Sequence, residues 1–177
     1  SGTIPIEAAM IALRIAPGLK RDFDFLHWAF YDKKFYFNEI EKAASIIDFH
    51  KDKKIFASDI NRDVLKIADV CAYKAGVSKA IDFKCKDAIE LSSNYSNGII
   101  ITNPPYGERL LDETEVNKLY KTFYSSFRKL DNWNLYFLSS NKNTEKAFGR
   151  KADKKRKFFN GNLECNLYQY YSPPPQI

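Results

Sequence analysis

The order of apolar segments along the chain constrains the fold most strongly. Four short apolar runs typical of buried strands alternate with stretches whose apolar residues recur at helical spacing. The strand-like runs are residues 54–59, 81–85, 98–102 and 133–138. This alternation predicts an α/β fold with a parallel sheet covered by helices on both faces. Residues 4–16 form an apolar helix of a kind that normally follows a strand, so we expect a first strand to be missing or truncated before residue 1.

The end of the chain departs from this alternation. Residues 158–159 and 163–171 are strand-like, and Asn160-Gly161 between them favours a tight hairpin. We therefore expect a mostly parallel sheet closed by a C-terminal antiparallel hairpin, in a single domain of 177 residues. Residues 19–53 are interpreted as a helical insertion, with Phe25 and Trp28 packing it onto the fold.

Composition narrows the function classes only a little. The chain carries 28 Lys and Arg against 22 Asp and Glu, and this surplus favours polyanionic partners without identifying one. Its apolar runs are far shorter than the roughly 20 residues of a membrane span, so we expect a cytoplasmic protein. Cys71, Cys85 and Cys165 lack metal-site spacing, and His27 and His50 lack a partner nucleophile. Neither a metal nor histidine catalysis is expected.

A four-residue motif suggests the chemistry. Asn103-Pro104-Pro105-Tyr106 follows the strand-like residues 98–102 directly, at the strand end where ligands bind in open α/β folds. Taken alone the motif also fits an ordinary turn. The exocyclic amine of a base is a poor nucleophile, and the side-chain oxygen of Asn103 with the carbonyl of Pro104 could accept its hydrogens from a rigid backbone. Tyr106 could stack on an extruded base, or it could be a core aromatic.

Several segments together resemble one enzyme family. These are residues 1–9 (SGTIPIEAA), 15–18 (IAPG), 58–59 (SD), 86–88 (KDA) and 103–110 (NPPYGERL). They resemble the catalytic domain of THUMP-containing large-subunit ribosomal RNA guanine-N2 methyltransferases over nearly the whole chain. The continuation through Gly107-Glu108-Arg109 is more discriminating than the Asn-Pro-Pro-Tyr core, which DNA adenine-N6 and protein glutamine methyltransferases share. The resemblance implies a Rossmann-like class I fold, S-adenosylmethionine as the cofactor, ribosomal RNA as the partner, and an RNA-binding THUMP domain N-terminal to residues 1–177.

The resemblance also implies roles for individual residues. The cofactor-binding residues would be Ser1, Gly2, Thr3, Asp59, Ile60, Asp87, Ala88 and Asn103. The first three would be the last part of a glycine-rich loop, Asp59 would accept from the ribose hydroxyls, and Asp87 would accept from the adenine amine. Structural alternatives stay open, since Asp59 could cap a helix beginning near residue 61 and Asp87 could cap the turn 88–91.

Candidate nucleic-acid contacts lie in two places. The densest basic stretch before the hairpin contains Arg150, Lys151, Lys154, Lys155 and Arg156. Such a run could follow phosphates, although it could equally be a solvated loop. Arg109, beside the Asn-Pro-Pro-Tyr motif, could contact a flanking phosphate or the cofactor.

The leading hypothesis is methyl transfer from S-adenosylmethionine to guanine N2 in RNA. The alternatives are a DNA adenine-N6 methyltransferase, a protein glutamine methyltransferase, a non-catalytic nucleic-acid-binding module and an ordinary dinucleotide-binding domain.

Overall fold

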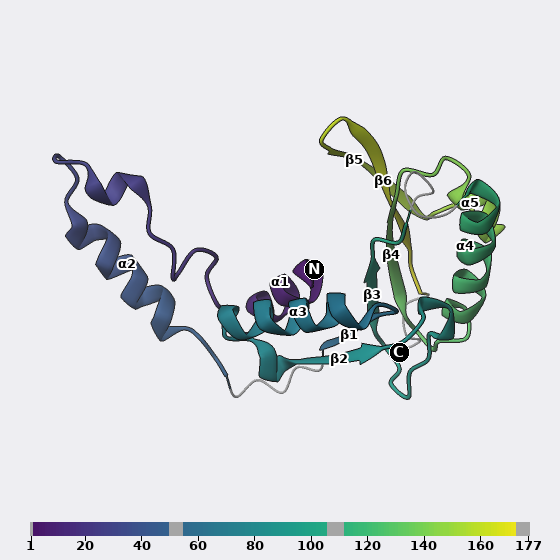
Figure 1. Ribbon diagram of the computed structural model, residues 1–177, viewed down its shortest axis with the longest axis horizontal. Coiled ribbons are helices and arrows are strands. Elements are labelled where there is room, and N and C mark those ends of the chain that lie inside the picture. The colour runs from purple at the N-terminus through teal and green to yellow at the C-terminus, as the bar shows by residue number, and fades with distance from the viewer. Residues whose placement is uncertain (1, 50–54, 106–111, 173–177) are drawn as a thin grey trace. The chain divides into compact units, whose positions relative to one another are not determined.

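A computed structural model describes residues 2–49, 55–105 and 112–172 (Figure 1). The chain divides into two compact units, residues 1–86 and residues 87–177. We call them unit 1 and unit 2 and describe each by itself. Within the described ranges, no helix is long and apolar enough to cross a membrane.

Unit 1 is built on a pair of parallel strands. β1 (Ile55–Asp59) pairs with β2 (Ile81–Cys85), and the register places Asp59 opposite Cys85. Two helices, α1 (Thr3–Ala12) and α3 (Arg62–Ala75), pack against these strands, and the 3-10 turn η2 (Ser78–Ala80) leads into β2. The small apolar core contains Ala9, Leu13, Ala72, Val77 and Ile81.

The insertion in unit 1 forms the 3-10 turn η1 (Asp24–His27) and helix α2 (Lys33–Ser45). Phe25 contacts neighbouring rings of the insertion itself, with ring centroids 5.5 Å from Phe23 and 5.0 Å from Tyr31. Trp28 is 53% exposed and lies beside Phe30, so its expected role in the core is wrong. Phe25 is a residue that other rings of the insertion contact, whereas Trp28, just after η1, lies on the surface.

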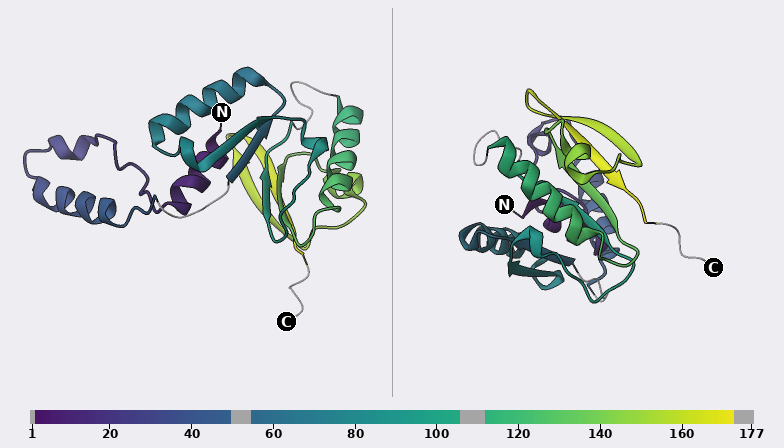
Figure 2. Two further views of the ribbon diagram at one scale, coloured as in Figure 1. Left: turned by 90° about the horizontal axis from the view of Figure 1, so that it is seen from below. Right: turned by 90° about the vertical axis from the view of Figure 1, so that its right-hand side faces the viewer.

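Unit 2 contains a four-stranded mixed sheet in the order β3-β4-β6-β5. β3 (Ile99–Thr102) runs parallel to β4 (Asn134–Ser139), whereas β5 (Lys154–Asn160) and β6 (Leu163–Tyr170) are antiparallel and join β4 through β6 (Figure 2). Asn160 pairs with Leu163, so the hairpin turn consists of Gly161 and Asn162, one residue later than expected. Gly161 has φ 63°, a left-handed conformation that glycine adopts without steric cost.

The core of unit 2 lies between this sheet and two helices, α4 (Glu113–Phe127) and α5 (Thr144–Phe148). Asp112 and Glu115 form a capping box at the start of α4, which satisfies backbone N–H groups that have no partner within the helix. The core is strongly aromatic and contains Tyr120, Phe123, Tyr124, Phe127, Phe137, Phe148, Tyr168 and Tyr170. The 3-10 turn η3 (Ala88–Glu90) packs against α4.

The predicted α/β class with parallel strands and a C-terminal hairpin is confirmed. The boundaries differ at some helices. α1 ends at Ala12 rather than near residue 16, because Arg14 adopts the left-handed conformation with φ 58°. In the insertion, α2 begins at Lys33, because Asp32 caps it by accepting from the Lys34 N–H at 2.9 Å. The parallel strands of the described residues belong to two sheets rather than one.

Gly98, just before β3, gives a stability prediction. A Cβ atom built there would lie 2.3 Å from the Trp133 ring, whose Nε1 donates to the Tyr95 carbonyl at 2.8 Å. Because that bond holds the ring in place, we expect Gly98→Ala to cost about 1–3 kcal/mol of unfolding free energy, measured by denaturant titration. The penalty should shrink in a Trp133→Phe background, and an equal penalty in both backgrounds would contradict this packing explanation.

Candidate active site

Asp59 ends β1 and has a backbone partner in unit 1. One of its carboxylate oxygens accepts the Asn61 N–H at 2.8 Å, and its carbonyl accepts the Lys86 N–H at 3.1 Å. Asn61 caps α3 by accepting from Asp63 N–H at 2.8 Å, so the alternative that Asp59 caps this helix is wrong. A carboxylate has about four acceptor positions, so the bond to Asn61 leaves Asp59 able to accept from hydroxyl groups.

Ile60 follows Asp59 and is exposed, and its carbonyl accepts a weak hydrogen bond from Cys85 Sγ at 3.5 Å. This contact ties the carboxyl ends of β1 and β2 together. Cys85 is a free thiol, as are Cys71 and the buried Cys165.

Gly2 precedes α1 in the left-handed conformation, with φ 74°. A Cβ atom there would lie 2.6 Å from the Cβ of Ala68 in α3, so glycine is required both by its backbone and by the approach of the two helices. Thr3 is the first residue of α1. Ser1 lies outside the described residues.

Asp87 begins unit 2, two residues after β2 ends. Its side chain accepts the Ile89 N–H at 3.0 Å and so caps η3, in which Ala88 is the first residue. The capping alternative for Asp87 is therefore confirmed, and it does not use all the acceptor positions of the carboxylate. The Ser126 hydroxyl donates to the Ile89 carbonyl at 2.6 Å and fastens η3 to α4.

Asn103, Pro104 and Pro105 follow β3 directly, as predicted, and therefore lie at its carboxyl end. Asn103 and Pro105 are exposed, whereas Pro104 is half-buried. Tyr106 and Arg109 lie outside the described residues.

A buried tyrosine holds this Asn-Pro-Pro loop. The Tyr120 hydroxyl of α4 donates to the Pro105 carbonyl at 3.1 Å and lies 2.9 Å from Ser139 Oγ, at the end of β4. Tyr120 and Ser139 are both fully buried. Ser139 Oγ also accepts the Asn141 N–H at 3.0 Å. The loop after β3 is thus fastened both to a helix and to the neighbouring parallel strand.

Tyr120 is a site residue that the sequence alone does not reveal. It lies on the apolar face of α4, where an aromatic ring reads as a core residue, and the ring does pack in the core, 4.8 Å from Phe137. Only its hydroxyl distinguishes it from a phenylalanine, and the partners of that hydroxyl are 15 and 19 residues away along the chain.

The basic stretch before the hairpin is partly neutralised. Arg150 donates to both carboxylate oxygens of Asp153, at 2.7 and 2.9 Å, and Lys155 forms an ion pair with Glu145 at 2.8 Å. The hydrogen bond from Lys155 lowers the pKa of the Glu145 carboxyl. Lys151, Lys154 and Arg156 are exposed, and a nucleic-acid role for this stretch stays a prediction.

Of the two histidines, one lies in the described parts of the chain. His27 is exposed and bonded to Asp22 at 3.0 Å, while His50 lies outside the described residues. Residues 2–49, 55–105 and 112–172 contain no group of three or more His, Cys, Asp or Glu side chains placed to hold a metal ion.

Paired parallel strands, a terminal hairpin and an Asn-Pro-Pro loop after β3 define a Rossmann-like class I methyltransferase. The chain belongs to the family of RMKL-like methyltransferase domains, whose model matches residues 1–169.

Three relatives show how far the similarity extends. The "Putative RNA methyltransferase YpsC" of Bacillus subtilis (strain 168) is 43% identical over 97% of this chain and 45% of its own length. The ribosomal RNA large subunit methyltransferase K/L of Shewanella sp. (strain ANA-3) is 41% identical over 97% of this chain and 25% of its own. The solved structure titled "Crystal structure of SMU.472, a putative methyltransferase complexed with SAH" is 38% identical with a TM-score of 0.94, covering 99% of this chain and 46% of that one. The chain thus spans half or less of the length of these relatives.

Proposed function

We propose that this protein transfers a methyl group from S-adenosylmethionine to the exocyclic N2 of guanine in large-subunit ribosomal RNA. The observation that carries the proposal is the Asn-Pro-Pro loop at the carboxyl end of β3, fastened through Pro105 to Tyr120. Membership of a methyltransferase family supports the reaction type, and the SAH bound to SMU.472 supports the cofactor. The names of the Bacillus and Shewanella relatives support RNA, and ribosomal RNA, as the substrate.

The residues fit the proposed cofactor by the chemistry of their donors and acceptors. In unit 1, Asp59 and the neighbouring Ile60 would lie against the ribose, because the carboxylate retains acceptor positions for two hydroxyls. Gly2 and Thr3, at the start of α1, would lie against the methionine part. In unit 2, Asp87 and Ala88 would meet the adenine. The cofactor, when bound, supplies an electrophilic methyl group on a positively charged sulfur.

The chain's own residues would activate the nitrogen. An exocyclic amine shares its lone pair with the ring, and acceptors that bind both hydrogens favour a geometry in which the pair points toward the methyl group. In the proposed complex, the Asn103 side-chain oxygen and the Pro104 carbonyl are these acceptors, and they stabilise the positive charge that develops on nitrogen. A nitrogen–carbon bond forms as the carbon–sulfur bond breaks, and the extra proton then leaves to solvent. Tyr106 would stack on the extruded base.

Product analysis tests the proposal. The full-length protein is incubated with methyl-labelled S-adenosylmethionine and unmodified ribosomal RNA, and the RNA is digested to nucleosides. We expect labelled N2-methylguanosine. Labelled N6-methyladenosine would overturn the choice of base, and transfer to DNA or protein with none to RNA would overturn the RNA substrate.

A further inference from the structure

A basic groove runs along the outside of unit 2, between α4 and α5. It encloses about 750 Å³, and the charged side chains that line it are Lys118, Lys121, Arg128 and Lys146 against one carboxylate, Glu113. All four cations are exposed. One carboxylate oxygen of Glu113 accepts a hydrogen bond from Asn143 Nδ2 at 2.7 Å, so the acidic side chain that lines the groove already has a neutral partner. The side chains that line the groove therefore carry a net positive charge.

The cations on α4 and at its C-terminal cap form a stripe along one side of the helix. Lys118 and Lys121 of α4 and the capping residue Arg128, which keeps a helical backbone conformation, are spaced by three and seven residues, which places them within one face. At a rise of about 1.5 Å per residue the stripe is about 15 Å long. None of the ion pairs found between described residues involves these cations or Lys146, in contrast to Arg150 and Lys155.

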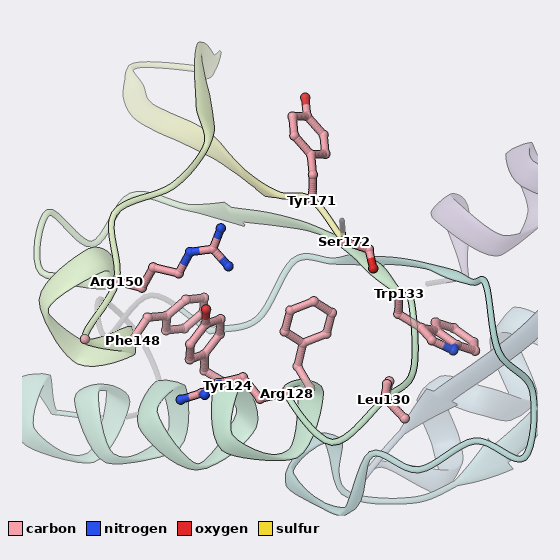
Figure 3. A pocket seen from close by; sticks show the side chains of 10 residues that line it. Tyr124, Arg128, Leu130, Trp133, Phe148, Arg150, Tyr171 and Ser172 are labelled. Carbon is pink, nitrogen blue, oxygen red and sulfur yellow. The ribbon is translucent and has the colours of Figure 1, made fainter. Parts of the chain in front are cut away.

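A second hollow continues the groove beyond Arg128. This pocket of about 420 Å³ shares Tyr124, Arg128, Phe148 and Gly149 with the groove and is also lined by Arg150 and Tyr171. Figure 3 shows the guanidinium of Arg150 on the same side of the pocket as the rings of Tyr124 and Phe148. Tyr124 and Phe148 are buried, whereas Tyr171 lines the pocket and is 41% exposed, so its ring is available for contact. Exposed cations with an exposed aromatic ring beside them are a combination that binds single-stranded nucleic acid.

We infer that the α4–α5 groove binds the sugar–phosphate backbone of the RNA substrate next to the target nucleotide. This inference rests on the proposed function. The groove is lined by Glu113 and Lys118 of α4, the same helix whose Tyr120 hydroxyl donates to the Pro105 carbonyl of the Asn-Pro-Pro loop. Lysine and arginine are the side chains that contact phosphates most often, and cations repeating along a helix suit the repeating charge of a nucleic-acid strand. This repeat favours RNA over an acidic protein partner.

Charge reversal in the groove tests the inference. In the full-length protein, Lys118→Glu, Lys121→Glu and Lys146→Glu are combined, and binding to a fluorescent ribosomal RNA transcript is measured by anisotropy at several salt concentrations. We expect at least about a tenfold loss of affinity at low salt. The plot of the logarithm of the RNA association constant against the logarithm of the salt concentration should become less steep by about 2, since each of the three lost phosphate contacts contributes about 0.7 to the steepness for single strands. The matched control reverses Lys33, Lys34 and Lys79 of unit 1 and should bind RNA like the wild type.

The outcomes separate this inference from the function on which it rests. A wild-type protein that forms no N2-methylguanosine overturns the proposed function in the product analysis, whatever the groove does. If the wild type methylates RNA but the groove variant keeps its RNA affinity and salt dependence, only the groove inference is overturned, and an acidic protein becomes the candidate ligand. An equal loss of affinity in the unit 1 control would also overturn it, because the effect would then come from net charge. Thermal unfolding of each variant confirms that it folds.

Discussion

Replacing Asn103 with alanine is expected to lower the rate of methyl transfer to RNA by at least about 100-fold, the loss typical when one preorganised group that stabilises developing charge is removed. The substitution takes away the side-chain oxygen that would accept an amine hydrogen, while the backbone carbonyl of Pro104 stays. Single-turnover transfer from methyl-labelled S-adenosylmethionine at saturating RNA measures this effect on the chemical step.

The control for this experiment is Asn162→Ala, the same chemical change in the exposed turn of the β5–β6 hairpin. It should leave the rate unchanged. A wild-type rate in Asn103→Ala would remove Asn103 from the mechanism and leave the loop after β3 without its proposed function. Because Asn103 is also a candidate cofactor contact, cofactor affinity is measured by calorimetry alongside, so that weak cofactor binding is not mistaken for slow chemistry.

Replacing Tyr120 with phenylalanine is the second large expected effect. The ring keeps its packing against Phe137, but the Pro105 carbonyl loses a donor at 3.1 Å and the Ser139 hydroxyl loses one of its two partners, the one at 2.9 Å. We expect kcat to fall by about tenfold or more, because a small displacement of the proposed acceptors removes catalytic alignment. The KM for RNA should change little, since Tyr120 is fully buried and cannot contact the substrate.

Stability alone would not explain such a result. Loss of the buried hydrogen bonds is expected to cost about 1–3 kcal/mol of unfolding free energy, measured by denaturant titration. Tyr170→Phe is a matched control, because it removes a hydroxyl from another fully buried tyrosine of the same core, one that lies 3.5 Å from the Arg150 carbonyl. If Tyr170→Phe slows the reaction as much as Tyr120→Phe at equal loss of stability, the positioning role is wrong.

Local patterns in the sequence determined the order of elements and the place of the loop. The strands at residues 55–59, 81–85 and 99–102 lie within one residue of the expected apolar runs, because such runs are bounded by residues that end a strand. The Asn-Pro-Pro motif follows β3 as predicted, because two prolines cannot continue the pairing of a strand. The cap at Asp87 was also available as an alternative, since it depends on a residue two positions away.

The tertiary structure decided which side chains meet over long distances in the chain. Tyr120 looked like an ordinary core aromatic, and only the fold brought its hydroxyl to the carbonyl of Pro105. The sequence predicts that Trp28 packs in the core, yet Phe25 packs against Tyr31 while Trp28 is exposed. The basic stretch at residues 150–156 is evident in the sequence because its cations are close together in the chain, whereas the groove cations are separated in sequence and gather only when α5 packs beside α4. Side-chain periodicity identifies the face of a helix, but which element covers that face is set by packing between segments that the local sequence does not relate.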